Sequence, residues 1–203
     1  MTNQPHPPCD AATVEFTGRA RLIAAIDRAV VLADAHAVTS ALRRALCELI
    51  ADPEVDLPPC VREPVHDHYA RREIYRSQEH GYSVVAMTWG PGQATPLHDH
   101  NGLWCVEGVW QGDLEITQYE LLERDGERYR FAATGGIQAG PGSAGSLIPP
   151  HEFHTIRNPS AHAIAITVHI YKGPMDCCSK FHPTEVGGWY ERERSILTTD
   201  AVT

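Results

Sequence analysis

The first quarter of the chain has the hydrophobic spacing of two amphipathic helices. Apolar residues recur every three or four positions over 22–33 and again over 42–50, which is the spacing of one face of a helix. Thr39 or Ser40 could cap the second helix, and Pro53 follows where that helix has to end. We therefore expect two scaffold helices that pack on the rest of the domain.

From residue 82 onward the pattern changes to one typical of β-strands. β-Branched and aromatic residues gather in short runs separated by clusters of Gly and Pro, as expected of strands and turns. The runs are 82–89, 103–111, 113–121, 128–132, 145–149, 153–157 and 163–171, and the clusters include 135–136, 140–142 and 158–160. Many short strands with regular turn signals predict an all-β sandwich or barrel. The expected fold class is therefore all-β, with N-terminal helices.

The run 163–171 is unusual because one of its faces is polar. Thr167, His169 and Tyr171 point one way along it, and the apolar residues between them point the other way. A buried hydroxyl, imidazole or phenol needs a hydrogen-bond partner. Two interpretations follow: an edge strand with its polar face in water, or a buried network. In the network, Thr167 would bond His169, which would orient Tyr171.

Histidines are the candidates for a metal site. His98 and His100 are separated by one residue, so on a strand both side chains would point to the same face. His154 is the third candidate, and His151 is its close competitor. Three converging imidazoles can bind a single divalent metal ion. The alternative is a pair of surface histidines that bind nothing.

Composition and charge argue against several other functions. The 203 residues are 42% apolar and 21% charged, as in a soluble globular protein. A net charge of −9 disfavours nucleic acids and anionic membranes as partners, and no apolar run is long enough to span a bilayer. The N-terminus lacks the features of a signal peptide, so we expect six reduced cysteines and a cytoplasmic location. Residues 1–14 are Pro-rich and should form a loose arm.

Two motifs resemble those of the cupin superfamily. The matching positions are Gly92, His98, His100 and Gly112 for the first motif, and Pro149, His154 and Asn158 for the second. Cys105 stands where many cupins carry a Glu ligand, so the resemblance leaves a site of three histidines. It implies a cupin-type small β-barrel (a double-stranded β-helix or jelly roll) over 65–203. The arm and scaffold helices of 1–64 would pack on this barrel as part of one structural domain.

Within the cupins, the chain resembles the thiol dioxygenases, and cysteine dioxygenase among them. The family's Ser-x-His-x-Tyr motif takes the form of Thr167, His169 and Tyr171. Cys105 lies five residues after His100, where the mammalian form has a Cys joined to the Tyr by a thioether. The resemblance thus implies that Tyr171, His169 and Cys105 are catalytic. It also implies that Thr167 holds His169 in place and that Cys105 and Tyr171 are cross-linked.

The family also has a Tyr-x-Arg motif, whose Arg holds the carboxylate of the substrate. Tyr69 and Arg71 match this motif, and Arg72 is a close competitor for the role of Arg71. Relatives that prefer 3-mercaptopropionate have Gln at the Arg position, so Arg71 favours L-cysteine. After the Tyr, the mammalian form has Ser-Pro-Pro with a cis peptide, whereas residues 172–174 here are Lys-Gly-Pro. A cis peptide before Pro174 therefore stays an open question.

The resemblance implies an iron(II)-dependent enzyme of cysteine catabolism that oxidises L-cysteine to cysteine sulfinic acid with O2. Iron(II) suits this reaction because it exchanges electrons with O2, whereas zinc has no redox chemistry. The expected partners are a small thiol amino acid and O2, with a monomer or weak homo-oligomer as the assembly. The alternatives are a 3-mercaptopropionate dioxygenase, a non-redox cupin metalloenzyme, and a cupin that only binds a metal or ligand.

Overall fold

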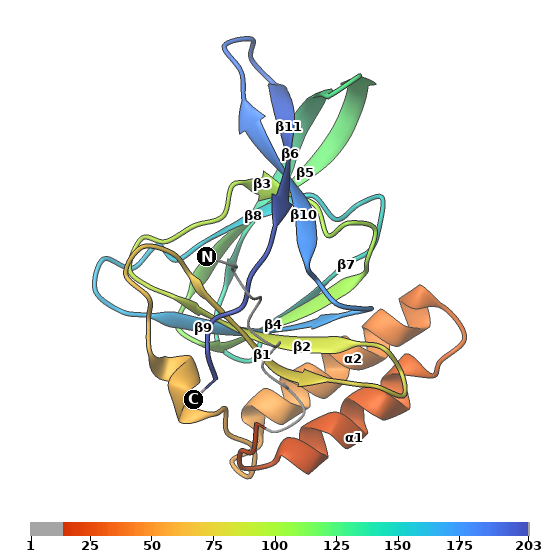
Figure 1. Ribbon diagram of the computed structural model, residues 1–203, viewed down its shortest axis with the longest axis vertical. Coiled ribbons are helices and arrows are strands. Elements are labelled where there is room, and N and C mark those ends of the chain that lie inside the picture. Colours follow the sequence, from red (N-terminus) through yellow and green to blue (C-terminus); the bar gives the residue numbers. More distant parts are fainter. Residues whose placement is uncertain (1–13, 203) are drawn as a thin grey trace, which may run out of the picture.

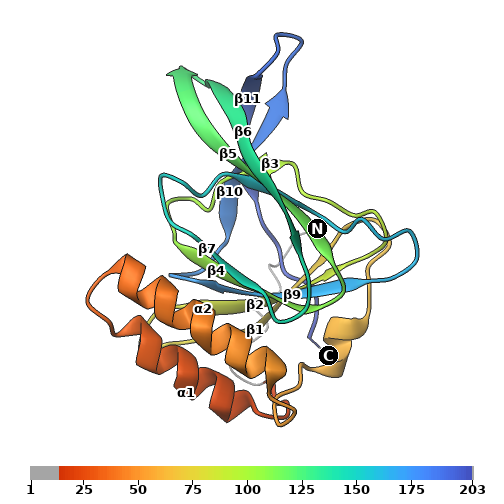
Figure 2. The ribbon, with the colours of Figure 1, turned by 180° about the vertical axis from the view of Figure 1, so that it is seen from behind.

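Two β-sheets, with a pair of helices against one of them, make up the computed structural model, which describes residues 14–202 (Figure 1). The Pro-rich arm expected at 1–14 lies outside the described residues, apart from Val14. Seen from behind, the helices lie along the outer side of the sheet that contains β2, β4 and β9 (Figure 2). None of the described helices is long and apolar enough to cross a membrane.

Both expected helices are present, with α1 at Arg19–Val30 and α2 at Ala35–Ala51. The prediction that Thr39 or Ser40 caps the second helix is wrong, because α2 begins one turn earlier. Asp34 is its cap, and the side chain of Asp34 accepts a hydrogen bond of 2.9 Å from a backbone N–H of the first turn. Asp caps a helix as well as Ser or Thr does, so the helix begins at the earlier residue and both hydroxyl residues lie inside it.

The strands form two antiparallel sheets. The five-stranded sheet has the order β1 (Ala70–Arg76), β2 (Ser83–Trp89), β9 (Ala165–Tyr171), β4 (Cys105–Gln111) and β7 (Ala144–Leu147). The second sheet closes on itself in the order β10 (Cys177–Pro183), β11 (Trp189–Ile196), β6 (Arg128–Ala139), β5 (Leu114–Asp125), β8 (His154–Arg157) and β3 (Leu97–His98). The prediction of an all-β fold with N-terminal helices is confirmed.

Three strands carry too few apolar residues to be recognised from the sequence. β1 and β11 read ARREIYR and WYERERSI, and β10 begins at two adjacent cysteines. Pairing with neighbouring strands, rather than an apolar alternation, makes them strands. The turn predicted at 135–136 is wrong, because β6 continues through both glycines and Gly136 pairs with Thr117. Both glycines lie in an exposed part of the ladder, where no packing requires a side chain.

β9 is the central strand of the five-stranded sheet and has buried residues on each of its faces. It pairs with β2 on one side and β4 on the other, so the alternative of a solvated edge strand is wrong. Ile166 and Val168 are buried in the core cluster that the sheet shares with the helices. Thr167, His169 and Tyr171 are each 2% exposed and lie on the opposite face. That face looks into the interior between the sheets.

The helices and the five-stranded sheet share one core. α2 lies so close to β4 that a Cβ atom on Gly108 would approach the Cδ1 atoms of Ile50 and Leu46 at 3.0 and 3.3 Å. This contact explains a glycine in the middle of a buried strand. The shared core supports our proposal that the segments 1–64 and 65–203 form one structural domain.

Candidate metal centre

Three histidines converge in the interior between the two sheets. His98 ends β3 and His154 begins β8, and the two residues are partners across these strands. Their Nε2 atoms are 3.2 Å apart. The candidate ligand atoms of His98, His100 and His154 all lie within 4.8 Å of one another. The alternative of a pair of surface histidines is therefore wrong.

His100 joins this group by a route other than the one predicted. β3 ends at His98, so the two side chains do not share a strand face. Instead, the chain turns after His100, whose carbonyl accepts a 3.0 Å hydrogen bond from the backbone of Leu103. Asn101 and Gly102 have positive φ angles of 52° and 77°. Asn and Gly are the residues that adopt this conformation most readily, so the local sequence supports the turn.

Burial keeps the three imidazoles neutral, which is the form that binds a metal. Desolvation lowers the pKa of His98 to about 4 and the pKa values of His100 and His154 well below their usual value. The Nδ1 atom of His98 lies 3.1 Å from the carbonyl oxygen of Pro96. A carbonyl can only accept, so Nδ1 carries the hydrogen and the Nε2 lone pair of His98 is free for a metal.

His151, the competitor of His154, is exposed at the surface. The amide of Asn158 fixes the chain beyond His154, because its Nδ2 donates to the carbonyls of Trp89 and Ala163 at 3.0 and 2.8 Å. Among the described residues, the cis peptide bond lies between Pro149 and Pro150, a few residues before His154. The peptide bond before Pro174, which the resemblance left open, is trans.

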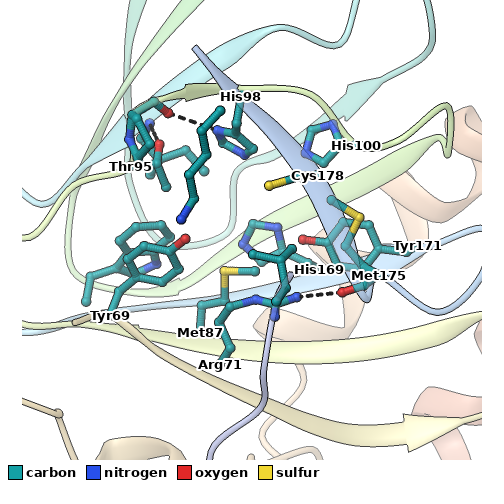
Figure 3. Close-up of a pocket in the computed structure, with 15 residues that line it drawn as sticks. Tyr69, Arg71, Met87, Thr95, His98, His100, His169, Tyr171, Met175 and Cys178 are labelled. Carbon is teal, nitrogen blue, oxygen red and sulfur yellow. Dashed lines mark hydrogen bonds between the residues drawn. The ribbon is translucent and has the colours of Figure 1, made fainter. Parts of the chain in front are cut away.

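A narrow pocket opens beside the histidines (Figure 3). Its lining comes from both sheets: Met87, His169 and Tyr171 from the five-stranded sheet, and His98 and Cys178 from the other. The volume open to the centre of a water-sized molecule is about 20 Å³, which holds about one water. A pocket this tight suits a small ligand.

Arg71, and not Arg72, belongs to this pocket. The two are neighbours on β1, so they point to opposite faces of the sheet. The guanidinium of Arg71 lines the pocket and donates to the backbone carbonyl of Met175 at 3.2 Å (Figure 3). It also donates to the backbone carbonyl of Thr198 at 2.9 Å. Arg72 donates to the carbonyl of Glu63 at 2.9 Å and to other groups on the far side. The structure thus brings together Arg71 and the histidines.

Tyr69 and Lys180 also line the pocket. The ring of Tyr69 stacks on Trp89, with 4.6 Å between the ring centroids, so it forms a rigid apolar wall. Lys180 is a second cation beside the pocket. Lys180 is not recognisable in the sequence as part of a site, because β10 has no clear strand pattern, although its neighbour Phe181 is buried.

Cys105 and Tyr171 face each other across β4 and β9. They are direct partners in the register of these antiparallel strands. Burial raises the pKa values of both groups well above their usual range, and a hydrogen bond from Tyr171 acts in the opposite direction on the pKa of Cys105. The thiol and the phenol are therefore protonated at neutral pH. The strand register holds them side by side.

The hydrogen bond predicted between Thr167 and His169 is present, with 2.8 Å between Oγ1 and Nε2. The indole of Trp89 donates to the same Oγ1 at 2.9 Å, so the Thr167 hydroxyl is free to donate to His169. This places the imidazole hydrogen of His169 on Nδ1. The rings of His169 and Tyr171 stack at 5.9 Å between centroids and 17° between planes. Ring stacking is thus the contact through which His169 can orient Tyr171.

Glu107 is a buried acid that the sequence analysis overlooked. It is 6% exposed, and desolvation raises its pKa to about 7. Its Oε1 lies 3.8 Å from Nδ1 of His154, and its Oε2 lies 3.4 Å from Nδ1 of His169. The signal was present, because Glu107 follows Cys105 by two residues on one strand and so shares its face. The motif comparison puts Cys105 at the cupin carboxylate position and therefore does not point to a second acid nearby.

The closed β-sheet, the central β9 and the three converging histidines define the chain as a cupin, as expected. Residues 64–184 match the family described as cysteine dioxygenase type I. Because this match covers more than half of the chain, the chain belongs to the cysteine dioxygenase type I family.

Curated relatives agree with this family. The chain is 25% identical to cysteine dioxygenase type 1 of Rattus norvegicus over 128 residues, which cover 56% of this chain and 59% of the relative. It is 24% identical to the Homo sapiens protein of that name over 153 residues, which cover 66% of this chain and 72% of the relative. The match to the rat protein therefore spans less than two thirds of its length.

Solved structures with a similar fold include two bacterial proteins. The TT1209 protein of Thermus thermophilus has a TM-score of 0.44 and 19% identity, and the match covers 58% of this chain and 95% of that one. A Klebsiella pneumoniae protein with a double-stranded β-helix domain has a TM-score of 0.46 and 16% identity, with 62% and 88% covered.

Proposed function

We propose that this protein is an iron(II)-dependent thiol dioxygenase that oxidises L-cysteine to cysteine sulfinic acid with O2. One observation carries the proposal: the ligand atoms of three neutral histidines converge, and two of these residues, His98 and His100, line a narrow pocket together with Arg71 and Tyr171. Membership of the cysteine dioxygenase type I family supports the reaction class. The physiological context would be cysteine catabolism.

His98, His100 and His154 would hold the metal. The fit rests on their chemistry: neutral imidazoles suit iron, copper, nickel and zinc, and the hydrogen on Nδ1 of His98 leaves its Nε2 free. When bound, iron(II) would exchange electrons with O2 and would bind the thiolate of the substrate. Affinity alone does not select iron over zinc or copper, so metal content has to be measured together with activity.

Arg71 would hold the carboxylate of the substrate, with Tyr69 as the adjoining wall. A guanidinium has five N–H donors in a planar fork, and the carbonyls of Thr198 and Met175 take up two of the five. The remaining donors can pair with a carboxylate in the pocket. Charge-assisted, bidentate hydrogen bonds of this kind offset part of the cost of removing the carboxylate from water.

Tyr171 would act as a hydrogen-bond donor to the reacting groups. Its raised pKa keeps the phenol protonated at neutral pH, and its stacking on His169 holds the ring in place. His169 in turn keeps one orientation because Thr167 holds its Nε2 atom. These residues therefore direct a proton donor into the pocket without carrying charge themselves.

We also propose that Cys105 and Tyr171 form a thioether. Their register across β4 and β9 supports it. The bond forms between Sγ and a ring carbon of the tyrosine, which lose the thiol hydrogen and one ring hydrogen. O2 would accept the two electrons and two protons.

Oxygen uptake by the iron-loaded protein tests the function. L-Cysteine, 3-mercaptopropionate and cysteamine are compared side by side, and the sulfinic acid product is identified by mass. We expect cysteine to be oxidised most efficiently, and cysteamine least because it has no carboxylate for Arg71. A lack of oxygen uptake with all three thiols would overturn the proposal in favour of a non-redox or ligand-binding cupin. A preference for 3-mercaptopropionate would change the substrate and leave the reaction class intact.

The proposal includes a cytoplasmic enzyme, as a monomer or weak homo-oligomer. Five cysteines of the described chain are free thiols, a state that persists in reducing compartments. Native mass measurement of the purified full chain tests the assembly.

A further inference from the structure

Glu107 lies between His154, a candidate metal ligand, and His169, which belongs to the network with Thr167 and Tyr171. Its two oxygens face Nδ1 of His154 at 3.8 Å and Nδ1 of His169 at 3.4 Å. Within the described residues, Oε2 of Glu107 and Nδ1 of His154 are both buried and have no hydrogen-bond partner. Buried polar groups of native proteins are almost always paired. Here the unpaired nitrogen of His154 faces one oxygen of Glu107, and the unpaired oxygen of Glu107 faces His169.

The hydrogens on the two imidazoles point toward Glu107. The Thr167 hydroxyl occupies Nε2 of His169, so the hydrogen of His169 is on Nδ1, the side that faces Glu107. The Nε2 atom of His154 faces that of His98, so a metal bound there leaves the hydrogen of His154 on Nδ1 as well. Nδ1 of His169 otherwise faces the Cys105 sulfur, a weak acceptor, at 3.9 Å, and Nδ1 of His154 has no hydrogen-bond partner among the described residues. A carboxyl group has two acceptor oxygens, one for each hydrogen.

We propose that Glu107 is a positioning residue for the metal ligand His154, accepting the Nδ1–H of His154 through one oxygen and the Nδ1–H of His169 through the other. This inference rests on the proposed function, in which His154 binds iron through Nε2. A histidine ligand that donates its other N–H to a carboxylate keeps one tautomer and one ring orientation, and it becomes a more basic ligand. Glu107 would also join the ligand to the Thr167–His169–Tyr171 network.

The orientation of the groups argues against Glu107 as a metal ligand itself. Its oxygens lie on the Nδ1 side of His154, whereas the three-histidine group meets at the Nε2 side of His98 and His154. A second metal held by Cys105, Glu107 and His169 is the competing arrangement, because their ligand atoms also lie within 4.8 Å of one another. The number of metal ions per chain separates the two arrangements.

The test measures iron(II) affinity of the full chain under anaerobic conditions, by competition with a chelator. Wild type is compared with Glu107→Leu, which has a similar volume and no acceptor, and with Glu107→Gln, which keeps an acceptor oxygen. Loss of a carboxylate partner of a histidine ligand weakens metal binding by about 10–100-fold. We expect this loss for Glu107→Leu and a much smaller one for Glu107→Gln.

Val106→Ala is the matched control. Val106 is fully buried on the same strand and packs in the helix-side core. This variant should unfold at a lower temperature and bind iron with wild-type affinity. The cobalt(II)-substituted protein gives a second readout, because its visible absorption reports ligand geometry. Its bands should change in Glu107→Leu and recover in Glu107→Gln.

Three results would overturn the inference. Glu107→Leu with wild-type iron affinity and an unchanged cobalt spectrum would show that Glu107 does not position His154. Two metal ions per wild-type chain, of which one is lost in Glu107→Leu and in Cys105→Ala, would make Glu107 a ligand. A wild-type protein that binds no iron would overturn the proposed function and this inference with it, whereas the first two results leave the proposed function intact.

Discussion

At the scale of single residues, hydrogen positions decide what each buried side chain can do. Pro96 fixes the hydrogen of His98, and Thr167 fixes that of His169, each through a hydrogen bond of ordinary length. As a result, Nε2 of His98 is free to bind a metal, and Nδ1 of His169 carries the hydrogen. Residues that pair with a histidine therefore contribute to this site by fixing the tautomer and orientation of its ring.

Removing one candidate ligand should remove the metal. His154→Ala should lose bound iron and all activity, because two imidazoles bind a divalent ion much more weakly than three. His151→Ala is the control, since His151 is exposed and outside the site, and it should keep both. Metal analysis after dialysis measures the result. Iron at wild-type stoichiometry in His154→Ala would contradict the assignment.

Arg71 should determine the affinity for the carboxylate. Losing a charged hydrogen-bond partner costs roughly 1–3 kcal/mol, so Arg71→Gln should raise KM for cysteine about tenfold to a hundredfold. It should also narrow the difference between cysteine and 3-mercaptopropionate.

The control for this change is Arg72→Gln. Arg72 binds the carbonyls of Glu63 and Ala201, so this variant should unfold more easily and keep the KM for cysteine. Steady-state kinetics with both thiols measures each variant. A raised KM in Arg72→Gln alone would mean that the wrong arginine has been assigned.

The thioether should be visible in the mass of the protein. After aerobic turnover with iron, the intact mass should fall by the mass of two hydrogens, and one thiol should be lost. Cys105→Ala should show neither change. An unchanged mass after extended turnover would mean that Cys105 and Tyr171 stay in contact without a bond.

At the scale of elements, β9 joins the two halves of the molecule. Its apolar face belongs to the core under α1 and α2, and its polar face belongs to the pocket. Because a strand cannot shift by one residue without exchanging its faces, the helix-side core also sets the register of the site. The N-terminal helices thus contribute to the site without touching it.

The cap of α2 should contribute measurably to stability. Asp34→Ala removes the hydrogen bond to the first turn and should cost about 1 kcal/mol, or about 2–4 °C in Tm for a chain of this size. Asp34→Asn keeps an acceptor and should be close to wild type. Thermal unfolding followed by circular dichroism measures both. Equal losses in the two variants would exclude capping as the cause.

At the scale of the whole molecule, the site concentrates neutral histidines in a low-dielectric interior. Their pKa values are lowered, to about 4 for His98 and about 3 for His169. The unfolded chain therefore binds more protons than the folded chain below the ordinary histidine pKa of about 6.5. Glu107 acts in the opposite direction, since its pKa is raised to about 7, but it is a single group acting against several histidines.

The metal-free protein should therefore lose stability in acid. As the pH falls from about 6.5 to about 4, the histidines of the unfolded chain gain protons that the buried histidines do not, and this favours the unfolded state. Urea unfolding at a series of pH values should give a falling free energy of unfolding over this range. Replacing Glu107 with Leu should steepen the fall, and a flat profile would contradict the burial of neutral histidines.

The sequence alone determined the features that depend on local periodicity. The two helices, most of the strands, the two faces of β9 and the pairing of Thr167 with His169 follow from residues close together in the chain. The candidate ligands and Cys105 also followed, through motifs with fixed spacing. Local periodicity says which way a side chain points, and in a strand or helix that is enough.

Only the tertiary structure decided which of these faces meet. Arg71 and Arg72 carry the same charge and are neighbours in the sequence. Arg71 belongs to the site because β1 and the chain near Thr198 close the pocket on its side of the sheet. Glu107 became part of the site because β4 lies beside β9 and opposite β8 in the interior. Contacts between distant strands depend on which strands become neighbours and on how the sheet closes, and the spacing of residues within one strand encodes neither. That is the physical reason why the sequence could place Glu107 on the strand face of Cys105 but could not place it beside His154 and His169.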